Sequence, residues 1–133
     1  MNKIEHIGIA VSNLEEAKRT FSKLLGTKSY KEETVESEGV TTAFFDVGGV
    51  KIELLQATKL DSPIAKFIEK RGEGIHHIAF DVDSADDKST ELRAGGFVVL
   101  NDQAKSGADN KLINFVHPKS SNGVLVELCE DKK

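Results

Sequence analysis

The chain has 133 residues, an apolar fraction of 38% and a formal net charge of −4 at pH 7. This length fits one domain or two small halves, and the mild negative charge argues against a nucleic-acid-binding surface. The single cysteine excludes an internal disulfide, and no apolar run approaches the roughly 20 residues that span a bilayer. The first residues enter a strand-like pattern without a signal-peptide motif, so we expect a cytoplasmic protein with no membrane partner.

The first half of the chain predicts the element order β-α-β-β-β. Residues 4–11 alternate between apolar and small or polar side chains, as a half-buried strand does. Residues 13–25 follow with helical spacing, either Ser12 or Asn13 as the cap, and Gly26 as the stop. Weak alternation with charged side chains covers 29–37, and stronger strands at 40–47 and 50–57 are joined by a Gly-Gly turn.

The second half repeats this order after a connector. We expect three parts: a first module at 1–57, a connector helix within 58–73 that begins near Pro63, and a second module at 74–130. The predicted elements of the second module are a strand at 74–82, a helix at 84–94, a short strand at 97–100, a polar loop at 101–110, and strands at 111–117 and 124–129.

Two histidines and two glutamates recur at equivalent points of the repeat. His77 follows His6 by 71 positions, and Glu127 follows Glu53 by 74. Each histidine lies on the strand face opposite the large apolar side chains. His76 shares parity with the apolar face, so we predict that it packs rather than binds a ligand.

Imidazoles and carboxylates together suit zinc, cobalt, nickel, manganese or iron(II). Each residue alone has an ordinary alternative, because strand histidines commonly pack and strand glutamates commonly face water. The repetition favours a metal site formed by His6, Glu53, His77 and Glu127, since an inward carboxylate is costly without a cation or proton. Asn114 lies among apolar residues of a strand; its amide either satisfies backbone groups or faces a pocket, and we favour the pocket.

These patterns resemble the vicinal oxygen chelate superfamily, which includes glyoxalase I, extradiol dioxygenases and antibiotic-resistance proteins. Within it the chain resembles the methylmalonyl-CoA epimerase family over nearly its whole length. The resemblance implies an α+β fold in which two tandem β-α-β-β-β modules with curved mixed sheets form a metal-binding cup. The segments that carry it are Glu5–Val11, Glu53–Leu55, Asp61–Phe67, Gly74–Ile78, Ile113–Lys119 and Gly123–Leu128.

The resemblance also implies an activity. It is the interconversion of (R)- and (S)-methylmalonyl-CoA through a metal-stabilised enolate, with cobalt, zinc, nickel or manganese as the ion and a homodimer as the assembly. Glu127 is the expected acid–base residue as well as a ligand. Lys111 and Lys119 flank the last hairpin, where they either bind the coenzyme A phosphates or are ordinary solvated lysines.

The sequence departs from the family at one point. Some members carry a glutamate base on the strand after the Gly-Val pair, and the corresponding residue here is Thr42. Threonine is not a base at neutral pH, so the second base is unassigned; Glu36, Glu38 and Asp46 share its strand parity.

Three other functions are compatible with this superfamily. A glutathione-dependent isomerase of the glyoxalase I type uses a similar four-ligand site. A drug-binding protein of the same fold has no need of all four ligand-type residues, so their presence counts against it. A dioxygenase is disfavoured, because its iron site uses two histidines and one carboxylate.

Overall fold

A computed structural model describes residues 1–133, and close contacts divide them into two compact units. One unit is His6–His76, and the other combines Met1–Glu5 with His77–Lys133. Each unit has the predicted β-α-β-β-β order, which confirms the α+β class. The finer division into 1–57, 58–73 and 74–130 stays a prediction.

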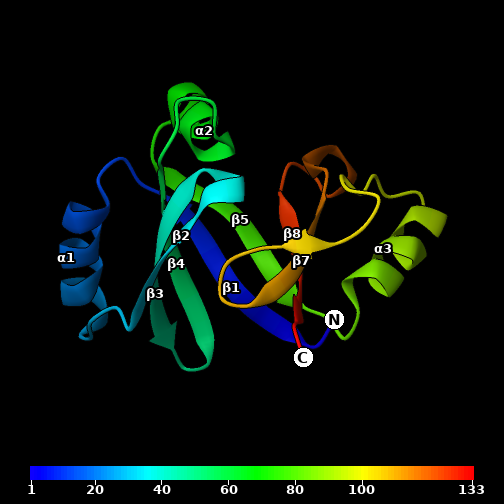
Figure 1. The fold of residues 1–133 in the computed structure, drawn as a ribbon, viewed down its shortest axis with the longest axis horizontal. Helices are drawn as coiled ribbons and strands as arrows, with labels where there is room; N and C mark the ends of the chain where they lie inside the picture. Colours follow the sequence, from blue (N-terminus) through cyan, green and yellow to red (C-terminus); the bar gives the residue numbers. More distant parts are fainter. The chain divides into compact units, whose positions relative to one another are not determined.

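The unit His6–His76 contains a four-stranded sheet in the order β2-β3-β4-β1, drawn from blue to green in Figure 1. β1 runs parallel to β4, and β2, β3 and β4 form an antiparallel meander. The parallel β1–β4 pair is possible because α1 and the other two strands lie between them in sequence. The elements are β1 (Lys3–Ala10), α1 (Leu14–Leu25), β2 (Lys31–Val35), the 3-10 turn η1 (Glu36–Glu38), β3 (Val40–Val47), β4 (Val50–Ala57) and α2 (Pro63–Arg71).

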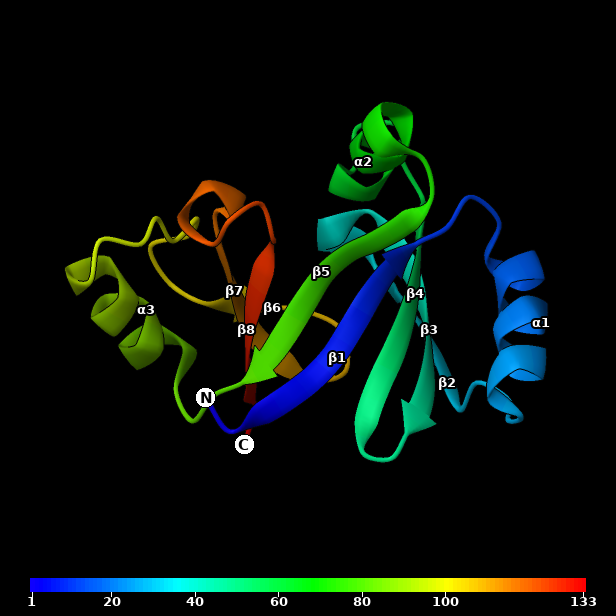
Figure 2. The same cartoon turned by 180° about the vertical axis from the view of Figure 1, so that it is seen from behind.

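Helix α1 covers one face of this sheet (Figures 1 and 2). The Asn13 side chain caps it by accepting a hydrogen bond from the Glu16 amide at 3.0 Å, and Gly26 ends it in the left-handed region with φ 71°. Both ends confirm the predicted boundaries. The core beneath the helix is apolar and consists of Val11, Leu14, Ala43, Phe45 and Leu54, with Ile9, Ala17, Phe21, Leu25 and Ile52 at its edge.

Helix α2 packs on the opposite face, at the end of the sheet where Ala10, Val40 and Leu55 are buried. The Ser62 hydroxyl caps it by accepting from the Ala65 amide at 3.1 Å, and Pro63 is its first residue. The predicted connector helix is therefore present. The remainder of this second face carries His6, Glu53 and Thr42, all of them buried.

The other unit contains a sheet in the order β5-β8-β7-β6. The predicted strand at 97–100 is wrong: it makes only an isolated bridge between Val99 and Val116. The fourth strand instead lies in the predicted polar loop, as the two-residue strand β6. The elements are β5 (Gly74–Asp81), α3 (Ala85–Ala94), β6 (Lys105–Ser106), β7 (Lys111–Val116), the 3-10 turn η2 (Pro118–Ser120) and β8 (Val126–Asp131).

This sheet also has two different faces. Helix α3 covers one of them, and its cluster contains Val82, Ala85 and Leu128. The other face carries Ala79, Ile113 and Cys129, with Phe115 packed against them. His77 and Glu127 lie on this second face, since they share strand parity with Ala79 and Cys129.

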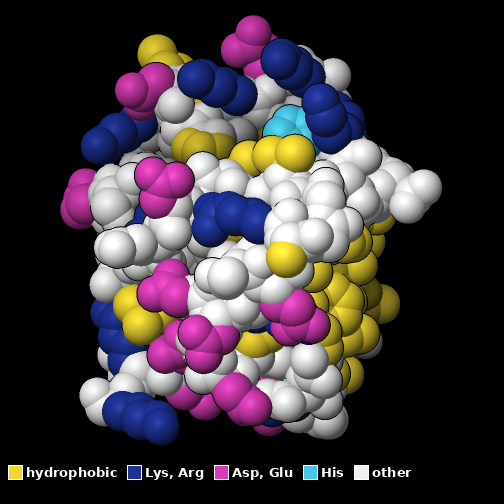
Figure 3. Space-filling view, turned by 90° about the vertical axis from the view of Figure 1, so that its right-hand side faces the viewer, with side chains coloured by type: hydrophobic (Ala, Val, Ile, Leu, Met, Phe, Trp, Pro, Cys, Tyr) yellow, Lys and Arg dark blue, Asp and Glu magenta, His cyan; other side chains and the backbone are white.

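The surface carries both signs of charge. On the face viewed in Figure 3, acidic and basic side chains are interspersed. None of the helices is long and apolar enough to cross a membrane.

Candidate functional site

The first predicted pair, His6 and Glu53, meets inside the unit His6–His76. The pairing of β1 with β4 sets Gly8 opposite Glu53, which brings the His6 ring and the Glu53 carboxylate onto the same face. His6 Nε2 lies 3.1 Å from Glu53 Oε1, and the two side chains are only 6% and 5% exposed. Phe44 stands directly opposite Glu53 on β3 and is itself buried.

The second pair repeats this arrangement in the other unit. His77 Nε2 lies 3.1 Å from Glu127 Oε1, and the side chains are 4% and 7% exposed. Phe115 takes the place that Phe44 has in the first unit, because it lies opposite Glu127 on β7. Its ring meets the His77 ring edge to face, with centroids 6.1 Å apart. The Cys129 thiol donates to Glu127 Oε2 at 2.8 Å and so holds the second carboxylate oxygen.

Each pair has the chemistry and spacing of two neighbouring metal ligands. Donor atoms that sit about 2.1 Å from one ion are roughly 3.0–3.4 Å apart in tetrahedral or octahedral geometry. The nitrogen-to-oxygen distance of 3.1 Å in both pairs falls in this range. A buried carboxylate also needs a cation or a proton nearby. The residues present therefore fit a divalent ion.

His76, next in sequence to His77, has a different environment. Its ring packs edge to face against Phe67 of α2, with centroids 4.9 Å apart. This is the packing role that its strand parity predicts.

Asn114 does not line the face that holds His77 and Glu127. It alternates with Phe115, so it points to the α3 side of the sheet, where it is completely buried. Its oxygen accepts from the amides of Asn101 and Phe115, and its nitrogen donates to the Asn101 carbonyl and the Ser89 hydroxyl. The pocket interpretation of Asn114 is therefore wrong, and its amide satisfies protein groups.

The two candidate lysines differ in exposure. Lys111 is buried, with its ammonium 3.8 Å from the buried Glu5 carboxylate and in contact with Asp131. These contacts favour an internal structural role over phosphate binding. Lys119 is exposed in η2, where the His117 ring accepts a hydrogen bond from its amide at 3.0 Å. Only Lys119 of the two presents its charge to solvent.

Thr42 is completely buried on the face of His6 and Glu53. The three carboxylates that were candidates for the second base lie at the ends of β3 or outside it. Glu36 and Glu38 belong to η1, before β3 begins. Asp46 lies at the β3–β4 turn, where its carboxylate accepts from the Gly49 amide at 2.9 Å.

Glu33 also lies on this face, although the sequence alone does not single it out. The pairing of β2 with β3 sets it directly opposite Thr42, on the same face. Its signal was present but weak: it belongs to the charged, faintly alternating stretch that precedes β3.

Comparisons with known proteins show which family this chain resembles. The family model of the glyoxalase/bleomycin resistance protein/dioxygenase superfamily matches residues 5–115. The uncharacterized protein YqjC of Bacillus subtilis (strain 168) is 41% identical over 132 residues, which are 99% of this chain and 94% of that protein.

Two further relatives have named activities. The ethylmalonyl-CoA/methylmalonyl-CoA epimerase of Cereibacter sphaeroides is 39% identical, and the match covers 96% of this chain and 97% of that protein. A solved structure of a Streptomyces coelicolor methylmalonyl-CoA epimerase variant, in complex with 2-nitronate-propionyl-CoA, superposes with a TM-score of 0.93. It is 34% identical, and the match covers 98% of this chain and 95% of that one. By its family model and by these full-length relatives, the chain belongs to the glyoxalase/bleomycin resistance protein/dioxygenase superfamily.

Proposed function

We propose that this protein is a metal-dependent epimerase that interconverts (R)- and (S)-methylmalonyl-CoA. The observation that carries the proposal is the duplicated, buried His–Glu pair, with the same 3.1 Å separation in each unit. The similarity to proteins named as epimerases of this substrate supports the choice of reaction within the superfamily.

His6, Glu53, His77 and Glu127 together would hold one divalent ion, in the cup that the superfamily resemblance implies. Cobalt, zinc, nickel and manganese all accept this mixture of imidazole and carboxylate ligands. The assembly that we propose is a homodimer.

The chemistry required is removal of a proton from the carbon between a thioester and a carboxylate. A bound divalent ion supplies Lewis-acid stabilisation of the negative charge that develops on the thioester oxygen. Glu127 takes the proton from one face of the carbon or returns it there. His77 and the Cys129 thiol hold the Glu127 carboxylate in place from two sides. Phe44 and Phe115 lie directly opposite the two glutamates on the neighbouring strands.

The substrate assignment is tested by comparing two reactions with the same purified protein. The proposal predicts epimerisation of methylmalonyl-CoA and no isomerisation of the adduct of methylglyoxal with glutathione. Activity on the glutathione adduct alone would overturn it in favour of the glyoxalase I type of isomerase.

The metal assignment is tested by measuring metal content in two neighbouring variants. His77→Ala should lose most of the bound ion, because it removes a proposed ligand. His76→Ala should keep it, because His76 packs against Phe67. Equal metal content in both variants would remove His77 from the proposed ligand set.

A further inference from the structure

An epimerase must exchange protons on both faces of one carbon, so it needs an acid–base group in addition to Glu127. In the unit His6–His76, the strand register shows which carboxylates lie on the same face as the His6–Glu53 pair and are therefore candidates for this group. On the face of His6 and Glu53, the aligned side chains of β2, β3 and β4 include three carboxylates: Glu53, Asp46 and Glu33. Glu53 is a proposed ligand, and Asp46 caps the Gly49 amide.

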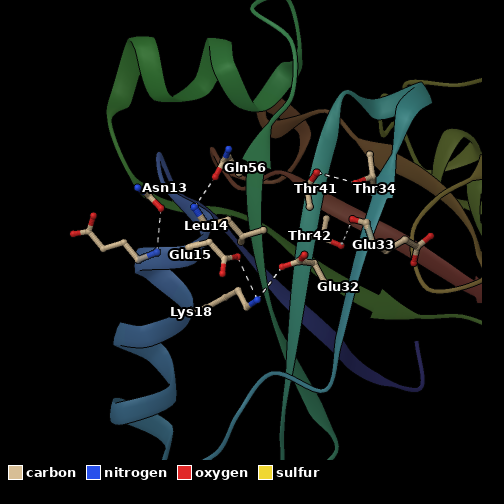
Figure 4. Close-up of polar contacts among 11 residues, drawn as sticks. Asn13, Leu14, Glu15, Lys18, Glu32, Glu33, Thr34, Thr41, Thr42 and Gln56 are labelled. Carbon is tan, nitrogen blue, oxygen red and sulfur yellow. Dashed lines mark hydrogen bonds and ion pairs between the residues drawn. The ribbon is translucent and has the colours of Figure 1, made fainter.

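We infer that Glu33 is the second acid–base residue of the active site. This inference rests on the proposed epimerase function. Glu33 lies on β2 directly across from Thr42, which in turn lies across from Leu55, two residues beyond Glu53 on β4. Figure 4 shows Glu32 directed toward Lys18 of α1 and Glu33 directed to the other side of the sheet.

Two strand spacings separate Glu33 from the His6–Glu53 pair. Neighbouring strands are about 4.8 Å apart, so β2 lies roughly 10 Å from β4. A short diacid unit bound at the pair, together with one glutamate side chain, bridges such a gap. Thr42 contributes a small side chain between them, and its hydroxyl turns away to the Glu33 carbonyl at 3.5 Å. Thr42 is itself completely buried, whereas the Glu33 side chain is 32% exposed, so the acyl group would meet the Glu33 carboxylate from the solvent side of β2 rather than over Thr42.

The surroundings of Glu33 suit proton transfer. Its side chain is 32% exposed, so it remains reachable by substrate and water. The Lys31 ammonium lies 3.5 Å from Glu33 Oε1 and also sits 6.0 Å from the centre of the Phe44 ring. Lys31 thus lies between the Glu33 carboxylate and the ring of Phe44, the side chain that faces Glu53.

The proton balance is simple. From one epimer, the Glu33 carboxylate takes the α-proton while the C–H electron pair passes into the enolate. Glu127, the other acid–base group, then delivers a proton to the opposite face of the same carbon. In the reverse direction Glu33, now carrying the proton, returns it to its own face.

The test compares Glu33→Gln with Glu32→Gln. Both changes remove one charge from the same strand, but Glu32 faces α1, where it pairs with Lys18 at 3.0 Å. Each metal-loaded protein is given each epimer separately in deuterated water, and epimerisation and α-hydrogen exchange are both followed. Thermal unfolding and metal content confirm that the variants are folded and loaded.

Glu33→Gln should lower the kcat of epimerisation by about 10²–10⁴-fold with little change in KM. It should abolish exchange in one epimer while the other still exchanges, because the group on the opposite face is intact. Glu32→Gln should change none of these quantities by more than about threefold.

Two results would overturn the role of Glu33 while leaving the proposed function in place. One is near wild-type epimerisation by the folded Glu33→Gln protein, and the other is equal loss of exchange in both epimers. A wild-type protein that neither epimerises nor exchanges methylmalonyl-CoA would instead overturn the proposed function, and the inference with it.

Discussion

Glu127 has two proposed roles, as a metal ligand and as a proton carrier. Glu127→Gln separates them, because the amide keeps an oxygen donor and nearly the same volume but loses its basicity. We expect turnover to stay about 10²–10⁴-fold below wild type even when metal is supplied in excess. Turnover is measured together with metal content. A fully metallated variant with near wild-type turnover would leave Glu127 as a ligand only.

Lys119 is the candidate contact for the coenzyme A phosphates, because its side chain is exposed whereas that of Lys111 is buried. Lys119→Glu should raise KM for the CoA ester several-fold and leave KM for a short pantetheine ester unchanged, because only the former carries the distal phosphates. Lys28→Glu, at an exposed position in the other unit, is the matched control. Equal effects on both esters would contradict the assignment.

At the residue scale, the sequence predicts the position of a side chain best when that position depends only on the alternation within its own strand. The alternation along β1 and β5 is enough to place His6 and His77 on a different face from their apolar neighbours. Glu33 could not be found this way, because its role depends on which residue of β3 lies opposite it. The environment of Asn114 is not predictable from its own strand for the same reason, because its face is fixed by the pairing of Phe115 with Glu127.

At the scale of elements, Asn114 connects β7 with α3 and with the segment around Asn101. Replacing it with leucine leaves several buried groups unpaired, each at a cost of about 1–3 kcal/mol. Asn114→Leu should therefore lower the free energy of unfolding by roughly 2–4 kcal/mol, measured by urea denaturation. Turnover per folded molecule should be unchanged. A selective loss of turnover in a stable Asn114→Leu protein would restore its role in substrate binding.

The helices and long strands were predictable because caps and periodicity are local signals. Asn13, Gly26, Ser62 and Pro63 mark the ends of α1 and α2 where the structure has them. Strand β6 was not predictable, since it has two polar residues and exists only by pairing with β7. The apolar segment 97–100 resembles a strand more closely, but only Val99 pairs, through one bridge.

Lys18 shows how one side chain can connect two elements. Its ammonium contacts Glu32 of β2 at 3.0 Å and Glu15 of α1 at 3.3 Å (Figure 4). The hydrogen bond to Glu32 is the main cause that raises the pKa of Lys18. The register of β2 places Glu32 opposite Ala43, on the α1 side of the sheet, and its contact with Lys18 lies on that side. This makes Glu32 a suitable control for Glu33.

At the scale of the whole molecule, the chain uses one structural unit twice. Each copy supplies a buried His–Glu pair, an opposing phenylalanine and a helix on the far face of its sheet. The copies differ in the side chains around these pairs. In the second copy the Cys129 thiol donates a hydrogen bond to Glu127, and in the first copy Glu33 lies opposite Thr42 on the next strand. We therefore propose that duplication supplies the four ligands, including Glu127, and that Glu33 adds a further acid–base group in the first copy.

The most direct test of the account is exchange of the α-hydrogen of methylmalonyl-CoA with deuterated water. The metal-loaded wild-type protein should incorporate deuterium and invert the configuration of the carbon. A chelator should stop both processes, and a divalent metal should restore them. A fully metallated protein that leaves the α-hydrogen in place, or exchange that persists after the metal is removed, would contradict metal-dependent epimerisation.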